Sequence, residues 1–106
     1  MLFQDLLSNS CVVGGTLAIV GKGVVLDTHH QDLTVVDESA NTSEPSVLSF
    51  ATYSKRLSLI GDAQQLPPVS ANAQMQRSLH ERLGRIAGFE VVMLTEQYRM
   101  VEEIAR

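Results

Sequence analysis

The sequence predicts an α/β fold in which helices cover both faces of a parallel sheet. Three short aliphatic runs, at residues 33–36, 56–60 and 91–94, alternate with segments of helical pattern. Each run is apolar on both faces, as strands are when helices lie on both sides of a sheet. The first run ends in two acidic residues, which favours a ligand site at the carboxyl edge of the sheet.

The helices between the predicted strands are identified by their first turns. Ser43 can cap a helix that has Pro45 in its first turn and continues to about residue 53. Ser78 and Glu81 form a capping-box pair for a second helix, which is predicted to end at Gly88. The apolar face of that second helix is formed by Leu79, Leu83 and Ile86.

Shorter signals predict the ends of the chain and its loops. Leu2 and Leu6 share one face of a helix at the start, and another helix begins at residue 101. A short strand is predicted at residues 12–13, before a glycine turn. The most flexible loops are predicted at residues 70–76 and 21–31.

The bulk composition limits the class of protein. With 106 residues, 44% of them hydrophobic, the chain is at most one small domain and is not disordered throughout. A net charge of −4 argues against a self-sufficient nucleic-acid binder. The single cysteine, Cys11, excludes an internal disulfide and fits a reducing, intracellular compartment, cytoplasmic or nuclear. No apolar run is long enough to span a membrane, and the acidic start does not read as a signal peptide.

Asp37 and Glu38 come directly after the first predicted strand and suit nucleotide hydrolysis. One carboxylate can hold Mg²⁺, directly or through water, and the next can orient or deprotonate the attacking water. As an isolated pair they are weak evidence, because acids at strand ends usually only face solvent.

The loop after the second predicted strand, Gly-Asp-Ala-Gln-Gln-Leu-Pro-Pro at residues 61–68, is the most specific run of the chain. Gly61 permits a sharp exit from the strand, and the two prolines stiffen the end of the loop. A rigid loop of this kind can hold a neutral amide against a γ-phosphate oxygen. The alternative is an Asx turn from Asp62 in a proline-fixed loop, which leaves the paired glutamines unexplained.

A third run, Leu-Thr-Glu-Gln-Tyr-Arg-Met at residues 94–100, completes a set that resembles superfamily 1 nucleic-acid helicases of the group that includes the nonsense-mediated-decay helicase. The resemblance extends from about residue 11 to residue 104. It implies that residues 1–106 form a single partial domain, the later part of the first RecA-like domain of a P-loop NTPase. The crossing to the second domain would fall at about residues 95–106. The phosphate-loop strand, which in such domains lies between the second and third predicted strands, is lacking.

The resemblance also implies a role for each matching residue. Asp37 would bind Mg²⁺, Glu38 would activate water, and Gln65 would sense the γ-phosphate. Arg99 would act as an arginine finger, since its planar fork suits phosphate oxygens; its alternative is a surface salt bridge to Glu102 or Glu103. The residues expected to contact ATP are Asp37, Gly61, Asp62, Gln65 and Arg99.

A weaker resemblance concerns the path of the nucleic acid. Val-Val-Gly-Gly-Thr at residues 12–16 resembles the family's strand end near this path, so Thr16 is predicted to contact a nucleic-acid phosphate. The alternative for Thr16 is a turn at the end of a strand.

The chain departs from the family pattern at several positions. The small residues Ser39 and Ala40 are interchanged, and Asn41 replaces a glutamine. His80 stands in place of an aromatic residue in a Ser-Leu-Phe-Glu-Arg-Leu pattern and is interpreted as a partly exposed helix residue. Val101 and Glu102 replace a His-Pro pair.

Two other signals are rejected. Residues 21–23, Gly-Lys-Gly, do not form a phosphate loop, because position 16 is not glycine and position 23 carries no hydroxyl. Residues 27–32 include His29 and His30, but adjacent residues of an extended chain point in opposite directions and do not easily share a metal ion.

The sequence supports two functional hypotheses. The first is a piece of an ATP-dependent RNA or DNA helicase, whose parent would use ATP and Mg²⁺, bind single-stranded nucleic acid and contain the remainder of the helicase core. The second is a non-catalytic helicase remnant or interaction module without ATPase activity. In either case the 106 residues are expected to be inactive alone, because they contain no phosphate-binding loop.

Overall fold

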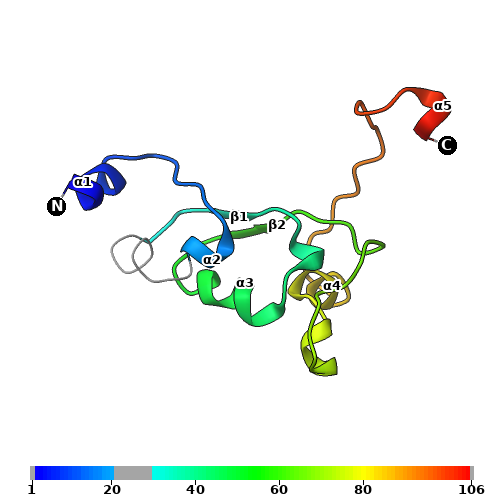
Figure 1. The fold of residues 1–106 in the computed structure, drawn as a ribbon, viewed down its shortest axis with the longest axis horizontal. Coiled ribbons are helices and arrows are strands. Elements are labelled where there is room, and N and C mark those ends of the chain that lie inside the picture. Colours follow the sequence, from blue (N-terminus) through cyan, green and yellow to red (C-terminus); the bar gives the residue numbers. More distant parts are fainter. Residues whose placement is uncertain (1, 21–29, 106) are drawn as a thin grey trace.

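The predicted α/β fold is confirmed by a computed structural model, which describes residues 2–20 and 30–105. Helices flank a small parallel sheet of two strands, β1 (Thr34–Val36) and β2 (Leu57–Leu59) (Figure 1). The strands pair in register, with Val35 opposite Ser58. Both agree with the first two predicted strands to within one residue at each end.

Backbone hydrogen bonds extend the pairing beyond the strands. The Ile60 N–H donates to the Val36 carbonyl oxygen at 2.9 Å, and the Ser39 N–H donates to the Ile60 carbonyl oxygen at 2.9 Å. These two bonds hold the segments that leave β1 and β2 side by side. The carboxyl edge of the sheet is therefore fixed beyond the last paired residues.

Helix α3 (Glu44–Ala51) connects β1 to β2 and covers the sheet. Ser43 occupies the N-cap position with extended backbone and Pro45 lies in the first turn, as predicted. The Ser43 hydroxyl makes no capping hydrogen bond to a backbone N–H and instead lies 2.8 Å from the Ser46 hydroxyl. The helix ends two residues earlier than predicted.

Helix α4 (Leu79–Gly84) begins as predicted and ends early. The Ser78 hydroxyl accepts a hydrogen bond from the Glu81 N–H at 3.1 Å, while the Glu81 carboxylate pairs with Arg85 at 2.8 Å. The predicted end at Gly88 is wrong. Ile86 lies outside the helix and is 43% exposed, so no buried contact sustains another turn.

The core lies between the sheet and these two helices. Val36, Val47 and Leu79 are buried together, and further aliphatic side chains pack against them from β2, from α4 and from the short helix α2 (Leu17–Val20). The half-buried members of this core are Leu17, Leu57, Leu59 and Leu83. The core is small and aliphatic.

Two predicted strands are not formed. Residues 12–13 and 91–94 are extended and exposed, and within residues 2–20 and 30–105 only β1 and β2 form a sheet. A strand needs a partner for its backbone groups, and the segment after α4 runs away from the sheet (Figure 1). The predicted loop at 70–76 contains a short 3-10 helix, η2 (Ala73–Gln76).

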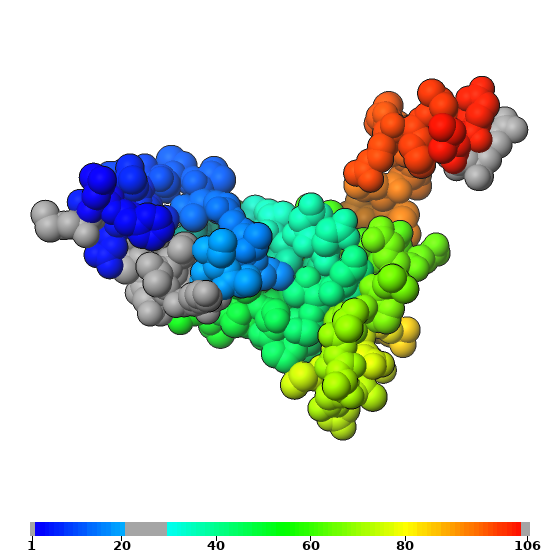
Figure 2. All heavy atoms as spheres, viewed as in Figure 1, coloured from blue at the N-terminus to red at the C-terminus, as the bar shows by residue number. Residues whose placement is uncertain are grey.

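Both ends of the chain project from the central body (Figure 2). Helix α1 (Leu2–Ser8) lies at one side, and the predicted C-terminal helix is present as α5 (Glu102–Ala105). In the described part of the chain, no helix has the length and apolar character needed to cross a bilayer. The rejected phosphate-loop signal at 21–23 and most of the predicted loop at 21–31 lie outside the described residues.

Candidate functional site

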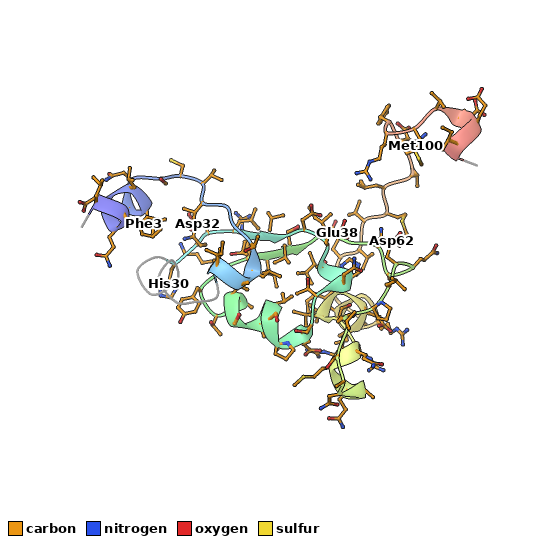
Figure 3. All side chains as sticks on the ribbon, viewed as in Figure 1. Phe3, His30, Asp32, Glu38, Asp62 and Met100 are labelled. Carbon is orange, nitrogen blue, oxygen red and sulfur yellow. The ribbon has the colours of Figure 1, made fainter. Side chains whose placement is uncertain are left out.

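Two of the segments that carry predicted site residues, the turn after β1 and the loop after β2, meet at the carboxyl edge of the sheet. Because β1 and β2 are parallel, the turn after β1 and the loop after β2 leave the same edge. Figure 3 labels one residue of each segment, Glu38 and Asp62, and shows them near one another. The structure thus brings Asp37 and Glu38 beside Gly61 and Asp62.

The turn that carries the two acids is compact and strained. The Glu38 N–H donates to the Asp37 Oδ1 atom at 2.9 Å. Glu38 adopts φ 51° and ψ 34°, the left-handed region, and is the non-glycine residue with positive φ among those described. Such a conformation is unfavourable for a side chain with a Cβ and is often found at functional sites.

Asn41 supports the Glu38 side chain. Its Nδ2 atom donates to the Glu38 Oε2 atom at 3.3 Å, from the short 3-10 helix η1 (Ser39–Asn41) that comes after the acids. The Thr42 hydroxyl donates to the Glu38 carbonyl oxygen at 3.3 Å. The substitution of asparagine for the family's glutamine therefore leaves a side-chain amide in contact with the acid.

The close approach of the two segments explains the glycine at position 61. Ser39 is fully buried, and its hydroxyl donates to the Ile60 carbonyl oxygen at 2.8 Å. A Cβ on Gly61 would lie 2.8 Å from the Ala40 nitrogen and 3.1 Å from the Ser39 Oγ atom. The prediction attributed this glycine to a sharp turn, whereas the structure shows that it makes room for the neighbouring backbone.

The loop after Gly61 begins with an Asx turn. The Asp62 Oδ1 atom accepts from the Gln64 N–H at 2.9 Å, and the Gln65 N–H donates to the Asp62 carbonyl oxygen at 3.1 Å. The Asx turn, which was the alternative interpretation of Asp62, is thus present in the structure. The Gln65 side chain is exposed, and its role as a phosphate sensor stays a prediction.

The segment that carries Arg99 lies apart from this edge. Met100 stands well away from Glu38 and Asp62 in Figure 3. A local clamp shapes the segment: the Gln97 Nε2 atom donates to the Met100 carbonyl oxygen at 2.8 Å, and its Oε1 atom accepts from the Met100 N–H at 2.9 Å. Arg99 is exposed, and both of its predicted roles stay predictions.

Tyr98 is held by an acid of the same run. Its hydroxyl donates to the Glu96 Oε2 atom at 2.6 Å. This hydrogen bond, with a smaller effect of desolvation, raises the pKa of the Tyr98 phenol above its usual value.

Thr16 begins a helix instead of ending a strand. Its carbonyl oxygen accepts from the Ile19 and Val20 N–H groups, both at 3.0 Å, which forms the first turn of α2. Its side chain is exposed, so a phosphate contact stays a prediction. Leu17, the next residue, packs on the core and fixes this turn beside the sheet.

Sequence reasoning missed two side-chain contacts, one beside the acidic turn and one between helices α3 and α4. The His80 Nδ1 atom lies 2.9 Å from the Ser39 hydroxyl. His80 is partly exposed, as predicted, but this contact was not expected. Arg82 binds Glu44 through two hydrogen bonds of 2.9 and 2.5 Å, which join α4 to α3 and raise the pKa of the Arg82 guanidinium. One signal in the sequence could have indicated these contacts. All four residues lie in the two runs, 37–45 and 78–83, that were compared with the family pattern.

The comparison with known proteins agrees with this fold and edge. The AAA domain family matches residues 2–73, which include the two acids and the loop after β2, and the chain belongs to this family. The resemblance to superfamily 1 helicases is confirmed: the matched proteins are helicases and a DNA-binding protein, and the chain is a superfamily 1 helicase-like sequence.

Three relatives illustrate the similarity. A probable helicase, MAGATAMA 3 of Arabidopsis thaliana, is 35% identical over 93% of this chain and 13% of its own length. The DNA replication ATP-dependent helicase/nuclease DNA2 of Bos taurus is 41% identical over 97% of this chain and 10% of its own length. The DNA-binding protein SMUBP-2 of Mesocricetus auratus is 41% identical over 77% of this chain and 9% of its own length. The chain thus spans about a tenth of these proteins.

Proposed function

We propose that this chain is the part of an ATP-dependent nucleic-acid helicase motor that supplies the metal- and water-binding side of the ATPase site. The observation that carries the proposal is the joint placement of the Asp37–Glu38 turn and the Gly61–Asp62 loop at one edge of a parallel sheet. The names of the relatives, which include ATP-dependent helicases, support the same function.

Asp37 is proposed to hold Mg²⁺. Its Oδ1 atom accepts from the Glu38 N–H, which leaves the Oδ2 atom for an ion or for the ion's water. Mg²⁺ commonly takes only one or two protein carboxylates and fills its other positions with water and phosphate oxygens, so this donor set fits it. When bound, Mg²⁺ would neutralise charge on the β- and γ-phosphates.

Glu38 is proposed to orient and deprotonate the attacking water. Its carboxylate is exposed at the edge and held on one oxygen by Asn41, which leaves the other oxygen to accept from water. Gly61 and Asp62 would shape the adjacent wall, and Gln65 would present its neutral amide to the γ-phosphate.

Arg99 is proposed to reach the same nucleotide when the remainder of the helicase core orders its segment. It lies beyond the residues that match the AAA domain family and on a segment that extends from the body. Single-stranded RNA or DNA is the proposed partner of the complete motor, and Thr16 is a candidate contact to its phosphates.

The alternative function is a helicase-like module without ATPase activity. The sequence contains no Gly-x-x-x-x-Gly-Lys-Ser/Thr run, so backbone amides that cradle phosphates would have to come from elsewhere. If the carboxyl edge takes part in an ATPase site, the 106 residues are expected to bind Mg²⁺–ATP weakly, at millimolar concentration, whereas the module without ATPase activity is expected not to bind it at this edge.

Titration of the ¹⁵N-labelled chain with Mg²⁺–ATP at millimolar concentration separates the two functions. The proposal expects amide shifts confined to the Asp37–Glu38 turn and the Gly61–Asp62 loop, and their loss in Asp37→Asn. Asp32→Asn is the matched control, because Asp32 lies before β1 and pairs with the exposed Lys55. Absence of shifts at the edge, with the fold intact, would support the module without nucleotide function.

A further inference from the structure

Ser39 is a buried hydroxyl between two polar groups. It is the residue after Glu38, is fully buried, and lies 2.8 Å from the Ile60 carbonyl oxygen and 2.9 Å from the His80 Nδ1 atom. The first group belongs to the segment leaving β2 and the second to α4. One side chain therefore joins three parts of the fold immediately beside the proposed water-activating acid.

The hydrogen-bond inventory fixes the direction of both bonds. A carbonyl oxygen only accepts, and two oxygens 2.8 Å apart need a proton between them, so the Ser39 hydroxyl donates to Ile60. A hydroxyl has one proton. Ser39 therefore accepts from His80, and the His80 Nδ1 atom must carry hydrogen.

This assignment has a chemical consequence for His80. In the neutral ring the proton sits on Nδ1 and the Nε2 atom is the acceptor, whereas the imidazolium carries protons on both nitrogens. The bond to Ser39 is present in both states. A phenylalanine at this position could not make it, and an alanine at position 39 could not accept it.

The two departures from the family pattern thus contact each other. The hydroxyl at position 39, where the chain has interchanged two small residues, meets the histidine that replaces an aromatic side chain. Leu79, the residue before His80 in α4, is buried in the core and fixes the position of the helix. The hydrogen bond from His80 therefore connects this fixed helix to Ser39. Ser39 is covalently bonded to Glu38, whose backbone is strained.

We propose that His80 is a positioning residue that, through an Nδ1–H···Oγ hydrogen bond to Ser39, holds the Glu38 backbone in its left-handed conformation. The role in ATP hydrolysis rests on the proposed function, whereas the hydrogen bond and its effect on the Glu38 backbone do not. His80 contacts no substrate in this role. The family pattern has an aromatic residue at this position, and a phenylalanine there could not donate this hydrogen bond.

The bond is tested first without nucleotide. Long-range ¹H–¹⁵N correlation spectra of the 106-residue chain should show the neutral His80 ring protonated on Nδ1, and Ser39→Ala should move the proton toward Nε2. Finding Nε2 protonated in the unmodified chain, or no change of tautomer in Ser39→Ala, would overturn the proposal.

The positioning effect is tested on the Glu38 backbone. His80→Phe should change the Glu38 HN–Hα coupling that reports its positive φ, and His80→Asn should restore it, because the asparagine amide can donate from the Nδ1 position. His30→Phe, a change at an exposed histidine that lies well away from Glu38 in Figure 3, is the control and should leave the coupling unchanged. An unchanged coupling in His80→Phe and Ser39→Ala alike would refute the role.

Nucleotide binding supplies a separate readout. His80→Phe should raise the dissociation constant for Mg²⁺–ATP, measured from the amide shifts at the edge, by about two- to tenfold, the range expected for one lost hydrogen bond. His80→Asn should recover most of this affinity. If the unmodified chain shows no such shifts, the proposed function fails, while the tautomer and coupling measurements still decide the role of His80. Normal Mg²⁺–ATP binding by His80→Phe despite a displaced Glu38 backbone would refute a contribution of this positioning to nucleotide binding.

Discussion

Glu38 and Gly61 face the same edge of the sheet and are constrained for different physical reasons. Glu38 has a side chain in a backbone region that disfavours one, and neighbouring hydrogen bonds hold it there. Gly61 has an ordinary backbone but no space for a Cβ. The type of residue at each position could be inferred from the motif, whereas the reason for it needed the neighbouring segment.

Gly61→Ala is therefore expected to destabilise the fold. Its Cβ would meet the backbone of Ala40, which cannot rotate away, and overpacking of this kind costs about 1–3 kcal/mol of unfolding free energy. The matched control is Gly84→Ala, where the added Cβ would have no atom within 4 Å besides its chain neighbours and the backbone of its own helix, and helix propensity predicts a gain of roughly 0.5–1 kcal/mol. Urea unfolding of both variants measures the difference, and equal stabilities would contradict the close approach.

At the scale of elements, α3 and α4 are joined by their side chains as well as by the core. The Arg82–Glu44 pair has two hydrogen bonds and lies on partly buried side chains, with 40% and 25% of their surfaces exposed. Arg85, the C-cap residue of α4, makes a single contact with Glu81, and the Arg85 side chain is 72% exposed. Bidentate geometry and partial burial distinguish the first pair from an ordinary surface salt bridge.

Arg82→Met is expected to lower the midpoint temperature of unfolding more than Arg85→Met does. Methionine keeps the apolar stem of the side chain, so the comparison isolates the charged contact. The effect of Arg85→Met should also disappear in high salt, because exposed pairs are screened. Circular dichroism melts of both variants with and without added salt provide the measurement; a larger loss in Arg85→Met would contradict the assignment.

The sequence predicted the elements whose signals are local and missed those that depend on neighbours. The starts of α3 and α4 have caps and first-turn residues, and β1 and β2 are short aliphatic runs. The end of α4 depends on whether Ile86 finds a buried surface. The run at residues 91–94 has the composition of a strand, but a strand also requires a partner whose position no local pattern encodes.

The candidate site was predictable to a similar extent. Motif order placed Asp37 and Gly61 at the same edge, since parallel strands end together. The contact between Ser39 and His80 was not predicted, because it joins residues 41 positions apart through a buried hydroxyl. The distance between Arg99 and the edge also depends on chain packing, which motif spacing does not describe.

The whole chain, with its two projecting ends, is extended for its size. Its radius of gyration is 16.2 Å, against roughly 13 Å for a compact domain of this length. Its accessible surface is 8719 Å², against roughly 5,800 Å² expected from the surface scaling of monomers at 11.6 kDa. Apolar burial is the main driving force for folding, so a chain that leaves this much surface exposed is expected to have a small free energy of unfolding.

The isolated 106-residue chain is therefore expected to melt broadly at low temperature. Calorimetry and circular dichroism of the monomer should show a weak transition, and Leu79→Ala should abolish it, because removal of a buried leucine side chain costs about 2–5 kcal/mol. Leu66→Ala, at an 81% exposed position, is the control that should leave the melt unchanged. A sharp, reversible, cooperative transition in the purified monomer would contradict marginal stability.

The left-handed backbone at Glu38 has an evolutionary consequence. Glycine is the residue that would relax this turn, and a single base change converts a glutamate codon to a glycine codon. The same change would remove the carboxylate that the proposed hydrolysis requires. Under the proposed function, selection for a more stable chain and selection for hydrolysis would therefore act in opposite directions at this one codon.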